Sequence, residues 1–156
     1  MSAYDPEAVV EIQQKIYRYG WCIDHRLYDE LDSIFAPDAV LHYDVSGGTM
    51  KPWAEMKGWL RERFPVFRVT QHNMSNPVID LDGETATSTT YGHLVHVQHL
   101  KDETTSVFRH YAIYRDNWQR TADGWRIQLR RLSNLYMEGP VYGPDRVYTY
   151  DELTPF

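Results

Sequence analysis

The sequence contains a single cysteine, Cys22, among its 156 residues, and this scarcity excludes two kinds of protein. One thiol cannot form an internal disulfide framework or a cysteine-rich zinc site, and it is compatible with a reducing cytoplasm. The sequence also lacks a charged N-terminal region followed by an apolar run, and no apolar stretch approaches the roughly 20 residues that span a bilayer. We therefore expect a soluble, cytoplasmic protein that does not bind a membrane.

Positive charge is also in short supply. The chain has 16 Lys and Arg against 22 Asp and Glu, for a formal charge of -6, and such a surplus repels a phosphate backbone. The one local basic cluster, Arg126, Arg130 and Arg131, is too small to indicate nucleic-acid binding. The sequence also has no G-x-G-x-x-G, P-loop, H-E-x-x-H or G-x-S-x-G motif. We expect no nucleic-acid partner, no cofactor and no metal.

Aromatic residues, in contrast, are abundant. They make up 14% of the chain and include twelve tyrosines, which is more than a hydrocarbon core needs and suits a cavity that holds a ring-shaped ligand. The length fits one domain over residues 1–156. The expected partner is a small hydrophobic, aromatic or polycyclic substrate.

The first part of the chain has the apolar periodicity of helices. Asp5 and Pro6 are a plausible N-cap and first-turn proline, and apolar residues then recur at helical spacing as far as Asp24. The same spacing predicts a short second helix over 27–35 that stops at a turn at 36–38.

A strand and a third helix are expected next. Residues 39–44 are typical of a short strand, and 51–64 predict a helix opened by Pro52.

The second part of the chain is typical of strands. Residues 69–132 are rich in Thr, Val and Tyr and are divided by Asp-Gly pairs at 82–83 and 123–124, which predicts about four antiparallel strands joined by hairpins. Residues 139–156 have no helical period and are expected to form an ordered C-terminal tail. Helices followed by an antiparallel sheet define an α+β fold in which the helices close one side of the sheet.

A histidine occurs at every third position of the segment H-L-V-H-V-Q-H, residues 93–99. In a helix the three would share a face and could bind one metal, but the neighbouring β-branched residues favour a strand. Positions three apart in a strand point to opposite faces, so either His96 alone or the pair His93 and His99 faces a cavity.

Other titratable residues lie among apolar neighbours: Asp24, His42, Tyr43 and His72. An aspartate beside a neutral histidine in a water-poor pocket makes a general base, because the carboxylate fixes the imidazole tautomer and stabilises the imidazolium. Structural roles remain open at this point: Asp24 could cap a helix, His72 could be a hydrogen-bonded core residue, and Tyr43 could simply pack in a core.

Four segments, in order along the chain, form a recognisable set: I-Q-Q-K-I-Y-R-Y-G-W-C-I-D, F-A-P-D-A-V, T-Q-H-N and D-G-W-R-I. They resemble the SnoaL-like proteins of the nuclear transport factor-like superfamily over roughly residues 8–132. The resemblance implies a cone, in which a strongly curved antiparallel sheet wraps around helices and encloses a deep pocket. It also implies a homo-oligomer, such as a dimer, formed through the outer face of the sheet.

Within this superfamily the site pattern resembles that of scytalone dehydratase. Asp24 matches the aspartate that ends the first helix, Tyr43 the carbonyl-polarising tyrosine, His72 the first histidine and His96 the second. The resemblance thus favours His96 among the three histidines of 93–99.

The same pattern has departures. Ile23 replaces a second catalytic tyrosine, and Ile113 and Arg115 stand where a serine and an asparagine would hold the substrate. With Trp21, these residues are expected to line the pocket and contact substrate.

The resemblance implies a cofactor-independent lyase or isomerase, a dehydratase or another β-eliminating enzyme. His72 would be the general base oriented by Asp24, Tyr43 would polarise a substrate oxygen, and His96 would donate a hydrogen bond or carry a proton. Hexachlorocyclohexane dehydrochlorinases use the same Asp/His pair, which supports elimination in general. The alternatives are a non-catalytic protein that binds a hydrophobic ligand and a polyketide cyclase; a limonene-type epoxide hydrolase would need two aspartates bridged by an arginine, a triad not evident in the sequence.

Overall fold

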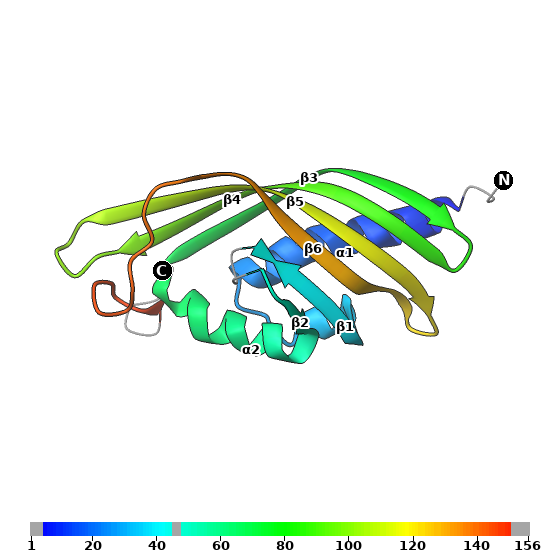
Figure 1. The fold of residues 1–156 in the computed structure, drawn as a ribbon, viewed down its shortest axis with the longest axis horizontal. Coiled ribbons are helices and arrows are strands. Elements are labelled where there is room, and N and C mark those ends of the chain that lie inside the picture. Colours follow the sequence, from blue (N-terminus) through cyan, green and yellow to red (C-terminus); the bar gives the residue numbers. More distant parts are fainter. Residues whose placement is uncertain (1–4, 45–47, 151–156) are drawn as a thin grey trace.

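Helices lead the chain and strands follow in the computed structural model, which describes residues 5–44 and 48–150 (Figure 1). The helical elements are α1 (Pro6–Asp24), the 3-10 helix η1 (Glu30–Ser33), α2 (Trp53–Arg63) and the 3-10 helix η3 (Phe64–Val66). The strands are β1 (Phe35–Tyr43), β2 (Met50–Pro52), β3 (Val69–Asp82), β4 (Thr85–His99), β5 (Thr105–Thr121) and β6 (Gly124–Glu138). The predicted α+β class is confirmed. No helix in the described part of the chain is both long and apolar enough to cross a membrane.

Helix α1 begins and ends where the sequence predicts. Asp5 caps it by accepting a hydrogen bond from the backbone N–H of Ala8 at 3.0 Å, and Pro6 occupies the first turn. Its buried face carries Ile12 and Ile16, which are fully enclosed. The apolar stripe therefore attaches the helix to the sheet.

The next segment differs from its prediction. The expected helix over 27–35 is reduced to the four residues of η1, and β1 already begins at Phe35. The expected turn at 36–38 lies inside β1, as an irregularity in the pairing between Phe35 and Val40. Pro37 has no N–H to donate to a neighbouring strand, so a bulged register suits it.

Six strands form one sheet in the order β2-β1-β6-β5-β4-β3. The four strands expected after residue 69 are confirmed, although β6 continues past residue 132 to Glu138. Both Asp-Gly turns are present, with positive φ at Gly83 and Gly124, a conformation that glycine adopts at no steric cost. Strand β2 was not predicted, and β1 pairs parallel with β6 while all other neighbouring strands are antiparallel.

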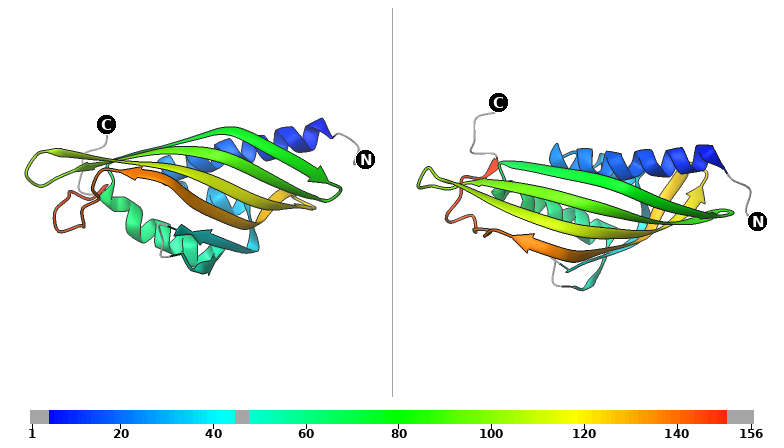
Figure 2. Two further views of the ribbon diagram at one scale, coloured as in Figure 1. Left: turned by 45° about the horizontal axis from the view of Figure 1, so that its top comes forward. Right: turned by 90° about the horizontal axis from the view of Figure 1, so that it is seen from above.

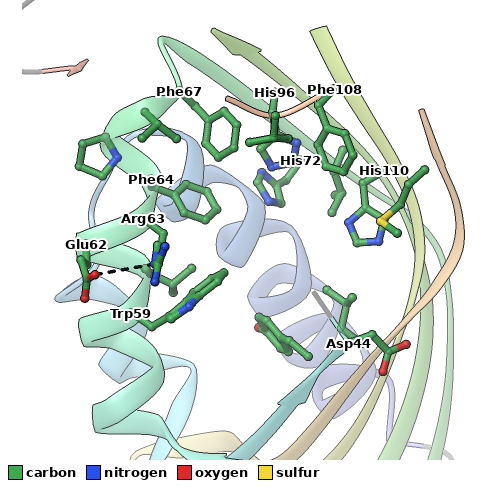
Figure 3. A pocket seen from close by; sticks show the side chains of 18 of the residues that line it. Asp44, Trp59, Glu62, Arg63, Phe64, Phe67, His72, His96, Phe108 and His110 are labelled. Carbon is green, nitrogen blue, oxygen red and sulfur yellow. Dashed lines mark ion pairs between the residues drawn. The ribbon is translucent and has the colours of Figure 1, made fainter. Parts of the chain in front are cut away.

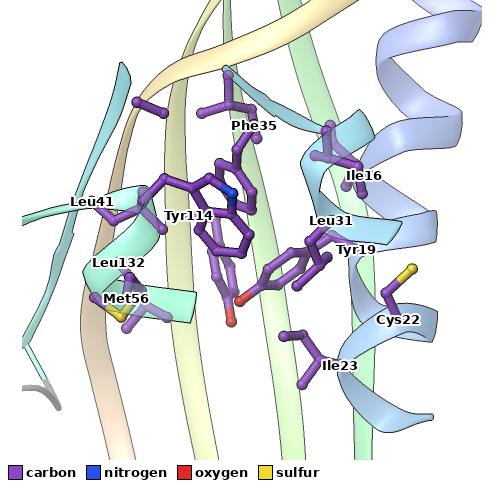
Figure 4. Packing of buried hydrophobic residues seen from close by; sticks show 14 of the residues in the cluster. Ile16, Tyr19, Cys22, Ile23, Leu31, Phe35, Leu41, Met56, Tyr114 and Leu132 are labelled. Atoms are coloured by element: carbon purple, nitrogen blue, oxygen red, sulfur yellow. The ribbon is translucent and has the colours of Figure 1, made fainter. Parts of the chain in front are cut away.

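The sheet is strongly curved, with α1 against its inner face and α2 below it (Figures 1 and 2). Between them lies the core, in which Tyr19 and Ile16 of α1 approach Phe35, Leu41 and Tyr114 of the sheet (Figure 4). This arrangement covers one side of the sheet, as predicted.

The outer face of the sheet bears aromatic side chains. Tyr91, Tyr136 and Leu135 are each more than half exposed, and Tyr136 contacts Tyr111 with ring centroids 5.8 Å apart. The expected homo-oligomer through this face stays a prediction.

The C-terminal segment is described as far as Tyr150, and residues 151–156 of the predicted tail lie outside the described range. The Gln98 amide accepts from the backbone N–H of Tyr142 and donates to its carbonyl oxygen, both at 2.8 Å. Val147, fully buried, forms a bridge with Leu100. The segment 139–150 is therefore fixed against the end of β4.

A buried ion pair joins β5 to β6. Arg130 donates two hydrogen bonds to the Asp116 carboxylate, both at 2.7 Å, and the two side chains are 0% and 1% exposed. The guanidinium lies 4.2 Å from the Tyr19 ring centroid and 4.9 Å from that of Tyr114. The two parallel hydrogen bonds and the contacts of the guanidinium with aromatic faces stabilise this buried charge pair.

Replacing Asp116 with Asn should lower the free energy of unfolding by about 3–5 kcal/mol, because it leaves a buried guanidinium without its counter-charge. Urea unfolding followed by circular dichroism measures this loss. The matched control is Glu55→Gln, which breaks the exposed Lys51–Glu55 pair and should change stability by only about 0.5 kcal/mol. Equal effects of the two substitutions would contradict a structural role for the buried pair.

Candidate active site

Asp24 and His72 are joined by two hydrogen bonds. The Asp24 Oδ1 lies 2.7 Å from the His72 ring Nδ1, and Oδ2 accepts the His72 backbone N–H at 2.8 Å. The side chains are only 15% and 3% exposed. A carboxylate at Nδ1 keeps the proton on that nitrogen and leaves Nε2 as the ring atom that takes a proton. The arrangement has the geometry of an oriented general base, and Asp24 is not the cap of the following helix, whose N-cap is Asp29.

A glycine in α1 permits this contact. A Cβ built on Gly20 would lie 2.7 Å from the His72 carbonyl oxygen and 3.3 Å from its Cβ. Glycine inside a helix costs about 1 kcal/mol relative to alanine, so it needs a packing reason. Here the reason is the close approach of α1 to β3, which brings Asp24 onto His72.

The His72 ring lies in the wall of a cavity of about 930 Å³ between the sheet, α2 and the segment 139–150 (Figure 3). His96 and Tyr43 line the same cavity, with Asp24 behind His72. Of the four predicted catalytic side chains, His72, His96 and Tyr43 thus line one cavity, and Asp24 is hydrogen-bonded to His72.

Aromatic rings line much of the remaining wall. Phe64 stacks against His72 with ring centroids 6.2 Å apart, and Trp59, Phe67 and Phe108 also line the cavity. The segment 139–150 contributes Val141 and Tyr142. This lining suits a flat, apolar molecule.

His96 faces inward, whereas His93 and His99 lie on the opposite face of β4. His93 stacks on Tyr111 at the outer surface, with centroids 4.5 Å apart. The alternation predicted for this strand is therefore confirmed: the three histidines do not form one site. In the described ranges, 5–44 and 48–150, no three His, Cys, Asp or Glu side chains group as a metal site.

His96 is surrounded by rings, and its centroid lies 4.8 Å from that of Phe67. Burial lowers the pKa of His96 to about 2, with further lowering by the neighbouring His72, His110 and Arg26. Its Nδ1 has no hydrogen-bond partner within the described residues. His96 is therefore a neutral imidazole at pH 7, suited to a hydrogen bond and not to carrying a positive charge.

Tyr43 lies at the floor of the cavity. Its hydroxyl is 3.0 Å from that of Tyr19, and burial raises the pKa of Tyr43 well above its usual value. The hydroxyl therefore keeps its proton and can donate it in a hydrogen bond. Arg130 also interacts with this hydroxyl and lies over the ring of Tyr19.

Four residues expected to contact substrate lie elsewhere. Trp21 is 54% exposed and stacks on His25 with centroids 3.9 Å apart, and Ile23 is fully buried in the core. Ile113 and Arg115 occupy the outward-facing positions of β5. In this strand the even-numbered residues 106–118 point inward, and all of them are buried except the half-buried Phe108, which lines the cavity. The expected match was displaced by one residue, which reverses the face.

Two polar residues that the sequence analysis missed also face the cavity, His110 from β5 and Asn134 from β6. The His110 Nε2 lies 2.6 Å from the Asn134 Oδ1, and His110 is 3% exposed. Strict alternation with the buried Tyr114 would have placed His110 inside. Asn134 lies beyond residue 132, where the sheet was expected to end.

The sequence of the chain is similar to those of known proteins. Residues 6–131 match the model of the SnoaL-like domain. The uncharacterized protein Rv2910c of Mycobacterium tuberculosis is 34% identical over 125 residues, which cover 79% of this chain and 82% of that one.

Solved structures share the fold. An NTF2-like protein with a cystatin-like fold from Novosphingobium aromaticivorans is 21% identical, with a TM-score of 0.69 and coverage of 83% of this chain and 82% of that one. A candidate scytalone dehydratase of the same organism is 21% identical, with a TM-score of 0.72 over 86% and 91%. A hexachlorocyclohexane dehydrochlorinase (LinA) type 2 is 16% identical, with a TM-score of 0.71 over 87% and 91%. At these identities the likeness extends to the fold, and the predicted cone is confirmed.

Gly20→Ala should destabilise the protein by about 1–3 kcal/mol, although alanine is the better helix former, because the added methyl group would push α1 away from β3. The matched control is Gly58→Ala in α2, where a Cβ would meet nothing within 4 Å; it should stabilise by about 0.5–1 kcal/mol. Thermal or urea unfolding of both variants measures the difference. A stabilised Gly20→Ala protein would refute the close approach.

His96 should make the protein less stable in acid. The unfolded chain protonates this residue below its ordinary pKa of 6.5, whereas the folded chain does so only near 2. Between these values the unfolded state binds more protons, so stability falls as the pH decreases, by up to about 1.4 kcal/mol per pH unit. Relative to its value at pH 8, the stability of His96→Phe should therefore decline less than that of the unsubstituted protein at pH 5. Urea unfolding of both proteins at pH 5 and at pH 8 measures the two declines in stability. Equal declines would mean that His96 is readily protonated in the folded protein, which contradicts the prediction.

Proposed function

Because the chain belongs to the SnoaL-like domain family, we propose that it is a cofactor-independent lyase or isomerase that removes a proton from a hydrophobic, ring-containing small molecule. The observation that carries the proposal is the Asp24–His72 pair, which is joined by two hydrogen bonds and lies at the wall of a largely apolar cavity. Elimination of water or of another leaving group is the reaction that this arrangement supports best.

The base is the His72 Nε2. It takes a proton from a substrate carbon, and the electron pair of that C–H bond forms the new double bond while the leaving group departs with the electrons of its own bond. The Asp24 carboxylate stabilises the imidazolium that results. Because Asp24 also holds the His72 backbone, the ring does not have to be ordered when substrate binds.

Tyr43 and His96, which line the same cavity, supply further hydrogen-bonding groups. Tyr43 keeps its proton and can donate to a substrate oxygen on which negative charge develops during deprotonation. Its hydroxyl pairs with that of Tyr19, so the two act on one region of the cavity. His96 assists in this scheme as a neutral hydrogen-bonding group.

The cavity accounts for the proposed substrate class. Its volume of about 930 Å³ holds a molecule larger than one ring. Trp59, Phe64, Phe67 and Phe108 present aromatic surfaces around it. A polycyclic or substituted aromatic molecule fits such walls, and none of these residues would react with it.

The alternative is a protein that binds such a molecule without transforming it. A binding pocket has no need for a carboxylate fixed to an inward-facing imidazole, and that pair favours the enzyme. The two functions differ in one measurable respect, since only the enzyme converts its ligand.

Replacing His72 with Ala should lower kcat by about 10² to 10⁴, because the substitution removes the proton acceptor. Turnover is measured on a substrate found by screening hydroxy- and halogen-substituted ring compounds against the unsubstituted protein, with loss of the C–H proton followed by NMR.

The matched control is His99→Ala, which removes a histidine on the outer face of the same sheet and should leave kcat unchanged. Circular dichroism establishes that both variants fold. A decrease of less than about tenfold in a folded His72→Ala protein would exclude His72 as the base, since a positioned base contributes more than this. Tight binding of a screened compound that is never converted would favour the binding protein.

A further inference from the structure

Three polar residues, two in strands and one directly after a strand, form a connected group on the cavity wall. His110 of β5 bonds to Asn134 of β6 at 2.6 Å, and the Asn134 backbone N–H donates to the Asp44 carboxylate, which follows β1, at 3.1 Å. All three residues line the cavity. The proposed base chemistry at His72 uses none of them.

His110 adds a polar ring to a cavity wall that is largely aromatic and aliphatic. His110 is 3% exposed, and burial lowers its pKa, so the ring is neutral at pH 7. The ring of Phe108, whose centroid lies 6.2 Å from that of His110, has no polar atoms. The neighbouring position in the wall is thus filled by a purely hydrocarbon ring. Burying a polar ring is unfavourable unless its nitrogens find partners, and Asn134 satisfies only one of them.

The hydrogen bond between His110 and Asn134 determines what the pair can bind. When the imidazole Nε2 donates to the amide oxygen, the His110 Nδ1 is left as an acceptor and the Asn134 NH₂ as a donor. When the Asn134 NH₂ instead donates to the His110 Nε2, the His110 Nδ1–H is left as a donor and the Asn134 amide oxygen as an acceptor. Both assignments leave one donor and one acceptor, and a hydroxyl group can bond to either of them because it both donates and accepts.

We propose that His110 and Asn134 form a subsite for a hydroxyl group of the ligand. The ligand is therefore a ring compound that carries a free alcohol or phenol in addition to the carbon that His72 deprotonates. The presence of a carbon that His72 deprotonates rests on the proposed function, whereas the hydroxyl subsite concerns binding alone.

The subsite is tested with 2-naphthol and 2-methoxynaphthalene, which share one ring system and differ in whether the oxygen carries a hydrogen. Equilibrium dialysis gives the dissociation constant of each for the unsubstituted protein and for the variants His110→Phe, Asn134→Leu and His72→Phe. His110→Phe keeps the ring and removes its nitrogens, and Asn134→Leu keeps the size of the amide. Circular dichroism establishes folding, and Asn134 is only half-buried, so Asn134→Leu decides alone if His110→Phe does not fold.

The unsubstituted protein should bind 2-naphthol about tenfold more tightly than its methyl ether, because the ether leaves a buried acceptor without a donor. The preference should fall to less than about threefold in His110→Phe and in Asn134→Leu, and it should persist in His72→Phe. A preference that survives in the His110 and Asn134 variants, or that disappears only in His72→Phe, overturns the subsite. Equal binding of both probes by the unsubstituted protein, or binding of neither, also overturns it.

These outcomes are separable from those of the catalytic proposal. A hydroxyl preference that depends on His110, in a protein that converts no compound, retains the subsite and removes the enzyme. Conversion of a substrate that depends on His72, without any hydroxyl preference, retains the enzyme and removes the subsite.

Discussion

The contact between α1 and β3 at Asp24 and His72 is the constraint on which the arrangement of the site depends. One carboxylate binds both the backbone and the ring of His72, so it fixes the end of a helix, the position of a strand and the direction of an imidazole together. The absence of a side chain at Gly20 lets the helix approach. A hydrogen bond between two residues that lie 48 positions apart in sequence thus connects the packing of α1 against β3 with the orientation of the His72 ring.

Two other polar pairs in the interior are likewise held by a partner from another element. Arg130 and Asp116 join β5 and β6, and the aromatic faces of Tyr19 and Tyr114 take the place of water around the guanidinium. His110 and Asn134 join the same two strands further along. A buried polar group with a fixed partner is already oriented, so less ordering is required when a ligand binds. His96 differs from these pairs, because its Nδ1 lacks a partner among the described residues, and His96 lines the cavity.

The sequence predicted what depends on local patterns and missed what depends on register. The bounds of α1, the two Asp-Gly turns and the placing of His96 on the face opposite His93 and His99 follow from periodicity and turn chemistry, and all three are confirmed. That His96 is the one that faces inward was implied by the family resemblance. The resemblance of short segments to a family paired Asp24 with His72 correctly in space. Ile113 and Arg115 were assigned by the same comparison across a strand where a shift of one residue exchanges the two faces. Nothing local in the sequence indicates the parallel pairing of β1 with β6, because that pairing is decided by how the whole sheet closes.

The distribution of polarity within the cavity determines how a ligand lies in it. The sheet contributes His72, His96 and His110, whereas α2 and the 3-10 helix after it contribute Trp59 and Phe64 together with the charged Glu62 and Arg63. A planar molecule that turned a hydrocarbon edge toward the sheet would leave imidazole nitrogens without partners. For the proposed substrate, an edge that carries oxygen atoms would therefore face the sheet, and this contact would orient the ring before any reaction occurs. The carbon presented to His72 would then be set by its position on the ring relative to those oxygen atoms.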